Sequence, residues 1–180
     1  MQTKKLLNIF NRKMEVWLDD LETMEDDLMM VKPSKNSWSM AELYDHVMRV
    51  GRTYQIPNLK QSITAAAKTK KRKNLAGVAI FNLKVRKNIK MRMENFPKPL
   101  VESFTPEKRS KSDLIKDFKL FIEEINDLEE ILIKSTKKNK QYHPMFGDIN
   151  TKEWFALIEL HIWQHDKQKK SIKDFLMSHI

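Results

Sequence analysis

The sequence predicts an all-α protein, and three observations support this fold class. The chain has 180 residues but only 3 glycines, and no run alternates Val, Ile or Thr with polar residues as a half-buried strand would. No Asn-Gly pair marks a tight hairpin turn. Long segments instead repeat apolar residues at steps of three and four, the period of an amphipathic helix. We therefore expect a four-helix bundle, formed by a single domain over residues 1–180.

The first two helices are predicted on either side of Pro33. An apolar stripe from Leu6 to Leu28 predicts one long helix that ends before this proline. The second helix has a capping box at its start, where the Ser39 hydroxyl can accept the Glu42 amide and the Glu42 carboxylate can accept the Ser39 amide. Its apolar stripe continues to Tyr54.

A long basic link is expected between the second and third helices. A break at Gly77 is followed by a short basic helix from about Val78 to Asn95, and prolines from Pro97 to Pro106 end regular structure. Ten Lys and Arg fall between Lys68 and Arg92, without a single Asp or Glu, and they account for much of the net charge of +10. Such a tract can be a solvated helix face, or it can attract nucleic acid, an anionic membrane or an anionic substrate.

The last two long helices flank an expected loop. The third opens near Ser112 and carries an apolar stripe from Leu114 to Leu132. Residues 137–141 predict a polar turn, and the H-P-M-F-G motif at 143–147 predicts an ordered loop. Asn150 and Glu153 then offer a cap for the fourth helix.

Two histidines interrupt the apolar seam of the fourth helix. His161 and His165 continue a stripe that begins at Trp154 and ends at Phe175, at positions where Leu or Ile would be expected. Imidazoles one turn apart can both face one metal ion, and His46 beside the stripe of the second helix is the best third ligand. The open alternative is three buried neutral histidines that hydrogen-bond to backbone groups or to Tyr44, Tyr54 or Gln168. Residue 162 is Ile, so the H-E-x-x-H motif of zinc proteases is absent.

The composition limits the cellular compartment and the kinds of functional site that this protein can have. The chain has no cysteine, which excludes disulfides, thiolate metal ligands and cysteine nucleophiles. No stretch approaches the ~20 apolar residues of a membrane span, and no signal peptide is recognisable. We therefore expect a cytoplasmic protein.

The motifs together resemble the DinB-like (DinB/YfiT-like) four-helix bundle metalloproteins, specifically a subgroup with an H-P-x-F-G loop. The likeness rests on WSMAELYDH at residues 38–46, on HPMFGDINTKEW at 143–154, and on His161-x-x-x-His165-x-x-Gln168. It implies a DinB-type bundle with a long crossover between helices two and three. It also implies a divalent metal, usually zinc or nickel, bound by His46, His161 and His165. Gln164 departs from relatives that have another histidine there, at a position expected to face away from the seam.

The resemblance also implies a function. Characterised relatives transfer low-molecular-weight thiols such as bacillithiol, mycothiol or glutathione, or isomerise maleylpyruvate, and relatives are often dimers. We therefore expect a metal-dependent thiol transferase, with a small, anionic thiol as substrate held near Arg86 or Arg92, and possible homodimers. The competing hypothesis is a non-catalytic stress-response or binding module with a structural metal or a nucleic-acid-contacting basic surface. No recognition motif accompanies the basic residues, and we expect neither a nucleic-acid nor a membrane partner.

Other side chains have expected supporting roles. Gln168 is the best candidate to orient a ligand histidine, ahead of Glu42 and Glu159, while Asp45 and Asp166 are expected at the surface. His143 is expected to anchor its loop, with Phe146 inserted into the end of the bundle. The tryptophans complete the set: Trp17 is expected in the core, Trp38 and Trp154 at the bundle ends, and Trp163 in a pocket or a subunit contact.

Overall fold

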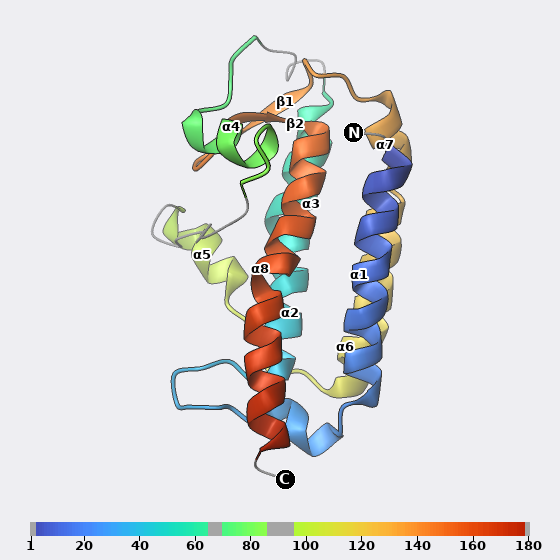
Figure 1. The fold of residues 1–180 in the computed structure, drawn as a ribbon, viewed down its shortest axis with the longest axis vertical. Helices are drawn as coiled ribbons and strands as arrows, with labels where there is room; N and C mark the ends of the chain where they lie inside the picture. Colours follow the sequence, from blue (N-terminus) through green and yellow to red (C-terminus); the bar gives the residue numbers. More distant parts are fainter. Residues whose placement is uncertain (1–2, 65–69, 86–95, 179–180) are drawn as a thin grey trace.

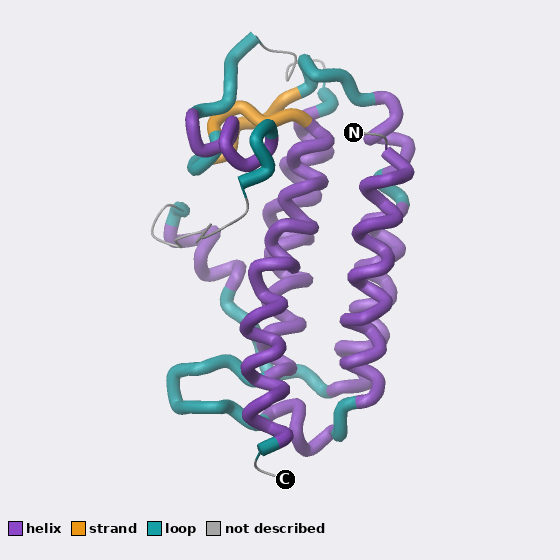
Figure 2. The backbone as a smooth tube through the Cα atoms, viewed as in Figure 1, coloured by secondary structure: helices purple, strands orange, loops and turns teal. Residues whose placement is uncertain are grey.

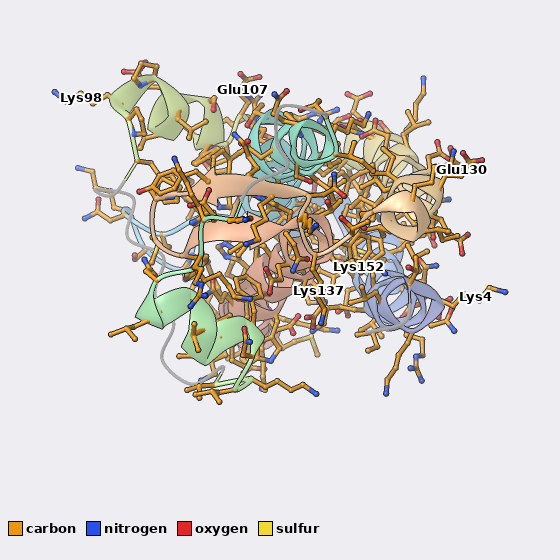
Figure 3. All side chains as sticks on the ribbon, turned by 90° about the horizontal axis from the view of Figure 1, so that it is seen from above. Lys4, Lys98, Glu107, Glu130, Lys137 and Lys152 are labelled. Carbon is orange, nitrogen blue, oxygen red and sulfur yellow. The ribbon has the colours of Figure 1, made fainter. Side chains whose placement is uncertain are left out.

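A computed structural model describes residues 3–64, 70–85 and 96–178, and these residues are mostly helical with a small two-stranded sheet. Long helices lie side by side along the longest axis, as Figures 1 and 2 show. Charged side chains at the periphery, such as Lys4, Lys98 and Glu130, project outward (Figure 3). None of the helices in these ranges is long and apolar enough to cross a membrane.

The first helix, α1, is shorter than predicted. It spans Thr3–Thr23 and buries one apolar stripe, which includes the expected core residue Trp17. The predicted continuation to Leu28 is wrong, because Asp26–Met30 forms a separate 3-10 turn, η1. Glu25 and the two aspartates that follow it explain the break. Negative charges are unfavourable at the carboxyl end of a helix and favourable at the start of the next turn.

The second long helical segment, called the second rod below, is continuous, but its helix type changes halfway. It consists of α2 (Met40–Val50), a π-helical turn η2 (Gly51–Gln55) and α3 (Ile56–Ser62), and both hydrogen bonds of the predicted capping box are present. A Cβ at Gly51 would lie 2.5 Å from Phe121 Cε2, so glycine allows this rod to lie close to the helix that carries Phe121. The wider π turn shifts the helix face, and Tyr54 and Gln55 are both buried as a result.

The link after the second rod differs from the expectation. Its first helix, α4, spans Leu75–Phe81 with Asn74 as its cap, while residues 86–95 of the predicted basic helix lie outside the described residues. A further helix, α5 (Lys98–Phe104), begins where the prolines were expected to end regular structure. Proline is tolerated in the first turn of a helix, where its missing N–H has no partner to lose, so Pro99 fits the second helical position.

The remaining helices complete a shared core. The third rod comprises α6 (Lys111–Asn126) and α7 (Glu129–Lys134), and it begins one residue earlier than expected, with Ser110 as its cap. The fourth, α8 (Thr151–Met177), has the predicted capping box of Asn150 and Glu153. Helix α1 packs against α6 and α8, and α2 packs against the same two helices. The four rods thus enclose buried aromatic residues such as Phe10, Phe118 and Phe155.

A β-hairpin replaces the expected turn and loop before α8. Strands β1 (Lys140–His143) and β2 (Gly147–Asn150) pair antiparallel, with His143 opposite Gly147. The connection has three residues, so the absence of an Asn-Gly pair, which marks two-residue turns, did not exclude a hairpin here. Gly147 has a φ of +70°, and a Cβ there would lie 2.8 Å from the Asn74 backbone nitrogen. The prediction of a purely helical chain is therefore wrong at this end of the molecule.

Candidate metal centre

Three histidines from two neighbouring helices converge as the sequence predicts. His46 lies on α2, and His161 and His165 lie one turn apart on α8. One ring nitrogen from each lies within 4.8 Å of the other two. The ring centroid of His46 lies 5.3 Å from that of His161 and 5.0 Å from that of His165. The arrangement, called the histidine triad below, has the ligand types and spacing that could hold a metal ion.

Two of the three rings are oriented by hydrogen bonds at their outer nitrogens. His46 Nδ1 donates to the Phe104 carbonyl at 2.8 Å, and His165 Nδ1 donates to Gln168 Oε1 at 2.9 Å. These bonds place the proton of both rings on Nδ1, so that each Nε2 carries the lone pair that a metal ion needs. Gln168 therefore has the orienting role expected of it. The Phe104 carbonyl was missed, because a backbone acceptor at the end of α5 leaves no signature in the sequence.

The donor set fits a divalent ion. Zinc binds histidine nitrogens at about 2.0–2.1 Å, which puts two ligands of a tetrahedral site roughly 3.4 Å apart. His161 Nε2 and His165 Nε2 are already 3.1 Å apart. Imidazole nitrogens also suit nickel and copper, so the geometry does not select the metal.

Burial keeps the triad in the neutral form that binds metal. Desolvation, and then the nearby His165, lower the pKa of His46 to about 4, although the Phe104 carbonyl partly offsets this. Desolvation also lowers the pKa of His161 well below its ordinary value, and that of His165 to a smaller degree. Neutral imidazole has a free lone pair for a metal, so protons compete weakly here near neutral pH.

Asp45 is buried, contrary to the surface position expected for it. It is only 1% exposed and accepts hydrogen bonds from Arg49 and from the Glu107 backbone N–H, at 2.6 and 2.7 Å. The second contact attaches α2 to the segment that follows Phe104. The carbonyl of Phe104 is the hydrogen-bond acceptor of His46. The two bonds compensate the burial of this carboxylate, which would otherwise be costly.

Two of the other acidic candidates, Glu42 and Asp166, have recorded partners outside the triad. Glu42 belongs to the capping box and pairs with Lys32. Asp166 is half-buried instead of fully exposed, and it accepts hydrogen bonds from Trp17 Nε1 and Lys13 Nζ. Glu159 is 7% exposed on α8.

Aromatic residues surround the triad more closely than expected. The Trp38 ring is centred 4.4 Å from that of His46 and 6.1 Å from that of His165, so its interpretation as a bundle-end residue missed its place at the site. Its position directly before the capping serine was a usable signal. Trp163 lines a cavity, one of its two expected roles. Gln164 was expected to face away from the seam, but it borders the same cavity. The reason is that the cavity extends past several neighbouring positions of α8.

The triad opens into a cavity of ≈ 650 Å³. Its walls are mainly apolar and aromatic and come from α2, η2, α5, the hairpin and α8. This volume lies in the range of pockets for small organic molecules. A ligand in the cavity would therefore have direct access to the three imidazoles.

His143 lies in the cavity wall but outside the triad. It is fully buried, its Nδ1 accepts the Met145 backbone N–H at 3.1 Å, and its ring stacks on Phe146 at 4.5 Å between centroids. It also contacts Trp154, which is buried near the start of α8. The expected role as an anchor of the loop is confirmed, with a hairpin turn in place of the loop.

The buried state of His143 predicts a loss of stability in acid. Desolvation lowers its pKa from 6.5 to about 4. Between pH 6.5 and about 4 the unfolded chain therefore binds a proton at this residue that the folded chain does not. As a result, the free energy of unfolding falls as the pH drops through this range. The full loss from this group is about 3 kcal/mol. Urea denaturation of metal-free protein at several pH values should show a shallower dependence for His143→Phe than for the wild type. Equal slopes would show that His143 contributes nothing to acid sensitivity.

None of the basic residues that the structure describes between positions 70 and 85 lines the cavity. Lys68, Arg86 and Arg92 lie outside the described residues, so their expected contacts with an anionic substrate stay a prediction. Lys73, inside the described range, forms an ion pair with Glu153 at the start of α8.

The sequence is similar to that of a distant relative. No protein-family model matches the sequence. The chain is similar to the uncharacterized protein YuaE of Bacillus subtilis (strain 168), with 24% identity over 169 residues. The alignment covers 93% of this chain and 97% of YuaE, so the likeness extends over nearly the whole length of both.

Proposed function

We propose that this protein is a DinB-like metal-dependent enzyme in which His46, His161 and His165 hold a divalent cation, zinc or nickel. The observation that carries the proposal is the convergence of three neutral imidazoles within 4.8 Å at the wall of an apolar cavity. The helical rods and the long link after the second rod agree with a DinB/YfiT-type bundle. The motifs around the triad support the same family.

The ligand set favours a catalytic over a structural metal. Closed structural zinc sites use four protein ligands, whereas catalytic sites use three and keep a position for substrate or water. Within the described residues, three side chains form the cluster, and it borders a cavity large enough for a substrate. When bound, a divalent cation supplies positive charge that lowers the pKa of a coordinated thiol or water.

The reaction that we propose is transfer of a low-molecular-weight thiol to an electrophile. The sulfur forms a bond to an electrophilic carbon, the leaving group departs with its electron pair, and the thiol proton goes to solvent. The chain contributes orientation and exclusion of water. Gln168 and the Phe104 carbonyl fix the rings, and Trp38 and Trp163 give the cavity apolar walls.

A fluorogenic conjugation assay tests this function. Zinc-loaded and nickel-loaded protein are mixed with glutathione, or with bacillithiol, and monochlorobimane, whose thioether product is fluorescent. We expect the wild type to accelerate conjugation, and His46→Ala to return the rate to that of protein-free buffer, because the variant lacks one ligand. Tyr44→Phe is the control, since it alters a buried hydroxyl that bonds the Trp17 carbonyl and lies outside both the triad and the cavity lining. No acceleration by the wild type with either metal and either thiol, or equal acceleration by His46→Ala, would contradict the proposal.

A further inference from the structure

Four buried side-chain atoms share an unusual property. Among the described residues they find no hydrogen-bond partner, and every one of them belongs to a residue that lines the same cavity: Tyr54 Oη, Gln55 Oε1, His143 Nε2 and His161 Nδ1. A buried polar atom without a partner is costly, and native proteins contain few of them. Their gathering around one space indicates that the cavity is built to hydrogen-bond a ligand.

Three of these atoms lie at the end of the cavity away from the histidine triad. Tyr54 and Gln55 follow His46 by about two turns along the second rod, and His143 packs against Trp154, two turns before His161 on α8. At about 1.5 Å of rise per residue, these positions are separated by roughly 10 to 13 Å along their helices. The Tyr54 and His143 rings are in contact, with centroids 5.7 Å apart. Tyr54, Gln55 and His143 are called the polar end below.

The hydrogen-bonding capacity of the polar end can be specified. His143 is neutral, and its Nδ1 accepts the Met145 N–H, so the ring proton lies on Nε2, which is a donor. Gln55 Nε2 is directed to the Leu157 carbonyl at 3.4 Å, which leaves Oε1 as an acceptor. The Tyr54 hydroxyl can donate or accept, because its pKa is raised by burial and it stays protonated. The polar end therefore offers both donors and acceptors.

The surroundings of the polar end disfavour a charged ligand. Phe96, Phe104 and Trp154 pack around Tyr54, with ring centroids 5.5 to 5.8 Å from its own. Among the described lining residues Lys167 carries a full charge, but it follows His165 by two positions and belongs to the triad side. A carboxylate or phosphate at the polar end would lose its hydration without a described cation to compensate it.

We infer that the cavity binds an elongated substrate whose far end is an uncharged group with both donor and acceptor atoms, such as a primary amide. Its apolar middle lies against the aromatic walls. This assignment rests on the proposed function only in placing the reacting end of the substrate at the triad. The polar end itself is defined by residues that do not belong to the metal centre.

Calorimetric titration with 4-phenylbutanamide tests the inference on the zinc-loaded full-length protein. Tyr54→Phe removes one hydroxyl and nothing else. We expect this change to weaken binding of the amide about tenfold, which corresponds to about 1.4 kcal/mol. Because this hydroxyl has no partner among the described residues, Tyr54→Phe should leave the melting temperature unchanged or raise it. An unchanged amide affinity, or no measurable binding by the wild type, would overturn the inference.

Tyr44→Phe is the matched control. The Tyr44 hydroxyl is equally buried but donates to the Trp17 carbonyl at 2.5 Å, outside the cavity lining. This variant should lose stability and keep its amide affinity.

A second comparison uses 4-phenylbutanoate on metal-free protein, because a carboxylate can also bind a metal. Binding of the carboxylate that is equal to or tighter than that of the amide would contradict an uncharged polar end. Zinc content separates the two proposals. Tyr54→Phe with normal zinc and normal amide affinity defeats the polar end alone, whereas a wild type without zinc that still prefers the amide defeats the metal centre alone.

Discussion

Saturating zinc is expected to raise the melting temperature of the wild-type protein by roughly 10 °C and to leave that of His161→Ala almost unchanged. A ligand that binds only the folded state stabilises it by about 4 kcal/mol at a thousand times its dissociation constant. For a chain of this length, 1 kcal/mol corresponds to roughly 2–4 °C. His161 contributes the nitrogen that faces His165 Nε2, so its loss leaves two ligands. Scanning calorimetry over a zinc titration measures the shift.

His143→Gln provides the control for this first prediction. It removes a buried histidine of the same cavity that lies outside the triad, and it should keep most of the zinc-dependent shift. An equal shift in His161→Ala and the wild type would mean that zinc stabilises the chain from some other site.

Asp45→Ala is expected to reduce both stability and metal affinity, although Asp45 is not a ligand. Its carboxylate lies between Arg49 and Arg109 and also accepts the Glu107 N–H. Removal of one partner from a buried ion pair costs about 3–5 kcal/mol, and the half-buried arginines place this case near the lower limit. The released segment also carries the Phe104 carbonyl that orients His46, so zinc affinity should fall about 10- to 100-fold.

Asp20→Ala separates these two effects. Asp20 is also a carboxylate shared by two cations, Lys169 and Lys173, but it lies on α1 and has no recorded contact with the Phe104 segment. Urea denaturation and zinc titration of both variants should show lower stability in each and weakened zinc binding in Asp45→Ala alone. Normal zinc affinity in Asp45→Ala would show that the Phe104 carbonyl does not depend on this carboxylate.

The features predicted most accurately from the sequence depend on local patterns. The capping boxes at Ser39 and Asn150 need residues only three positions apart, and both are present. The apolar stripes likewise predicted the buried faces of the long helices. His161 and His165 were recognisable because polar residues interrupted such a stripe. His46 was chosen from its place beside the stripe of the second helix, and the family resemblance then strengthened this choice, since the relative direction and offset of two helices are not local properties.

The features that were missed depend on contacts between distant segments. The Phe104 carbonyl meets His46 across 58 positions of sequence, and Gly147 needs its positive φ because the backbone near Asn74 lies against it. Asp45 was placed at the surface because a charged residue is usually exposed. Its burial follows from two arginines, one of them 64 positions away. Tyr54 was counted as a stripe residue, and only the π turn and the hairpin together bring it beside His143.

The central claim is that three imidazoles share one divalent cation, and metal stoichiometry tests it most directly. Wild type, His46→Ala and His161→Ala are purified without chelator, dialysed against a small excess of zinc or nickel, freed of unbound metal, and measured by inductively coupled plasma mass spectrometry. We expect about one ion per chain in the wild type and almost none in either variant, with unchanged helical content by circular dichroism. A wild type that retains no more metal than the two variants would contradict the claim.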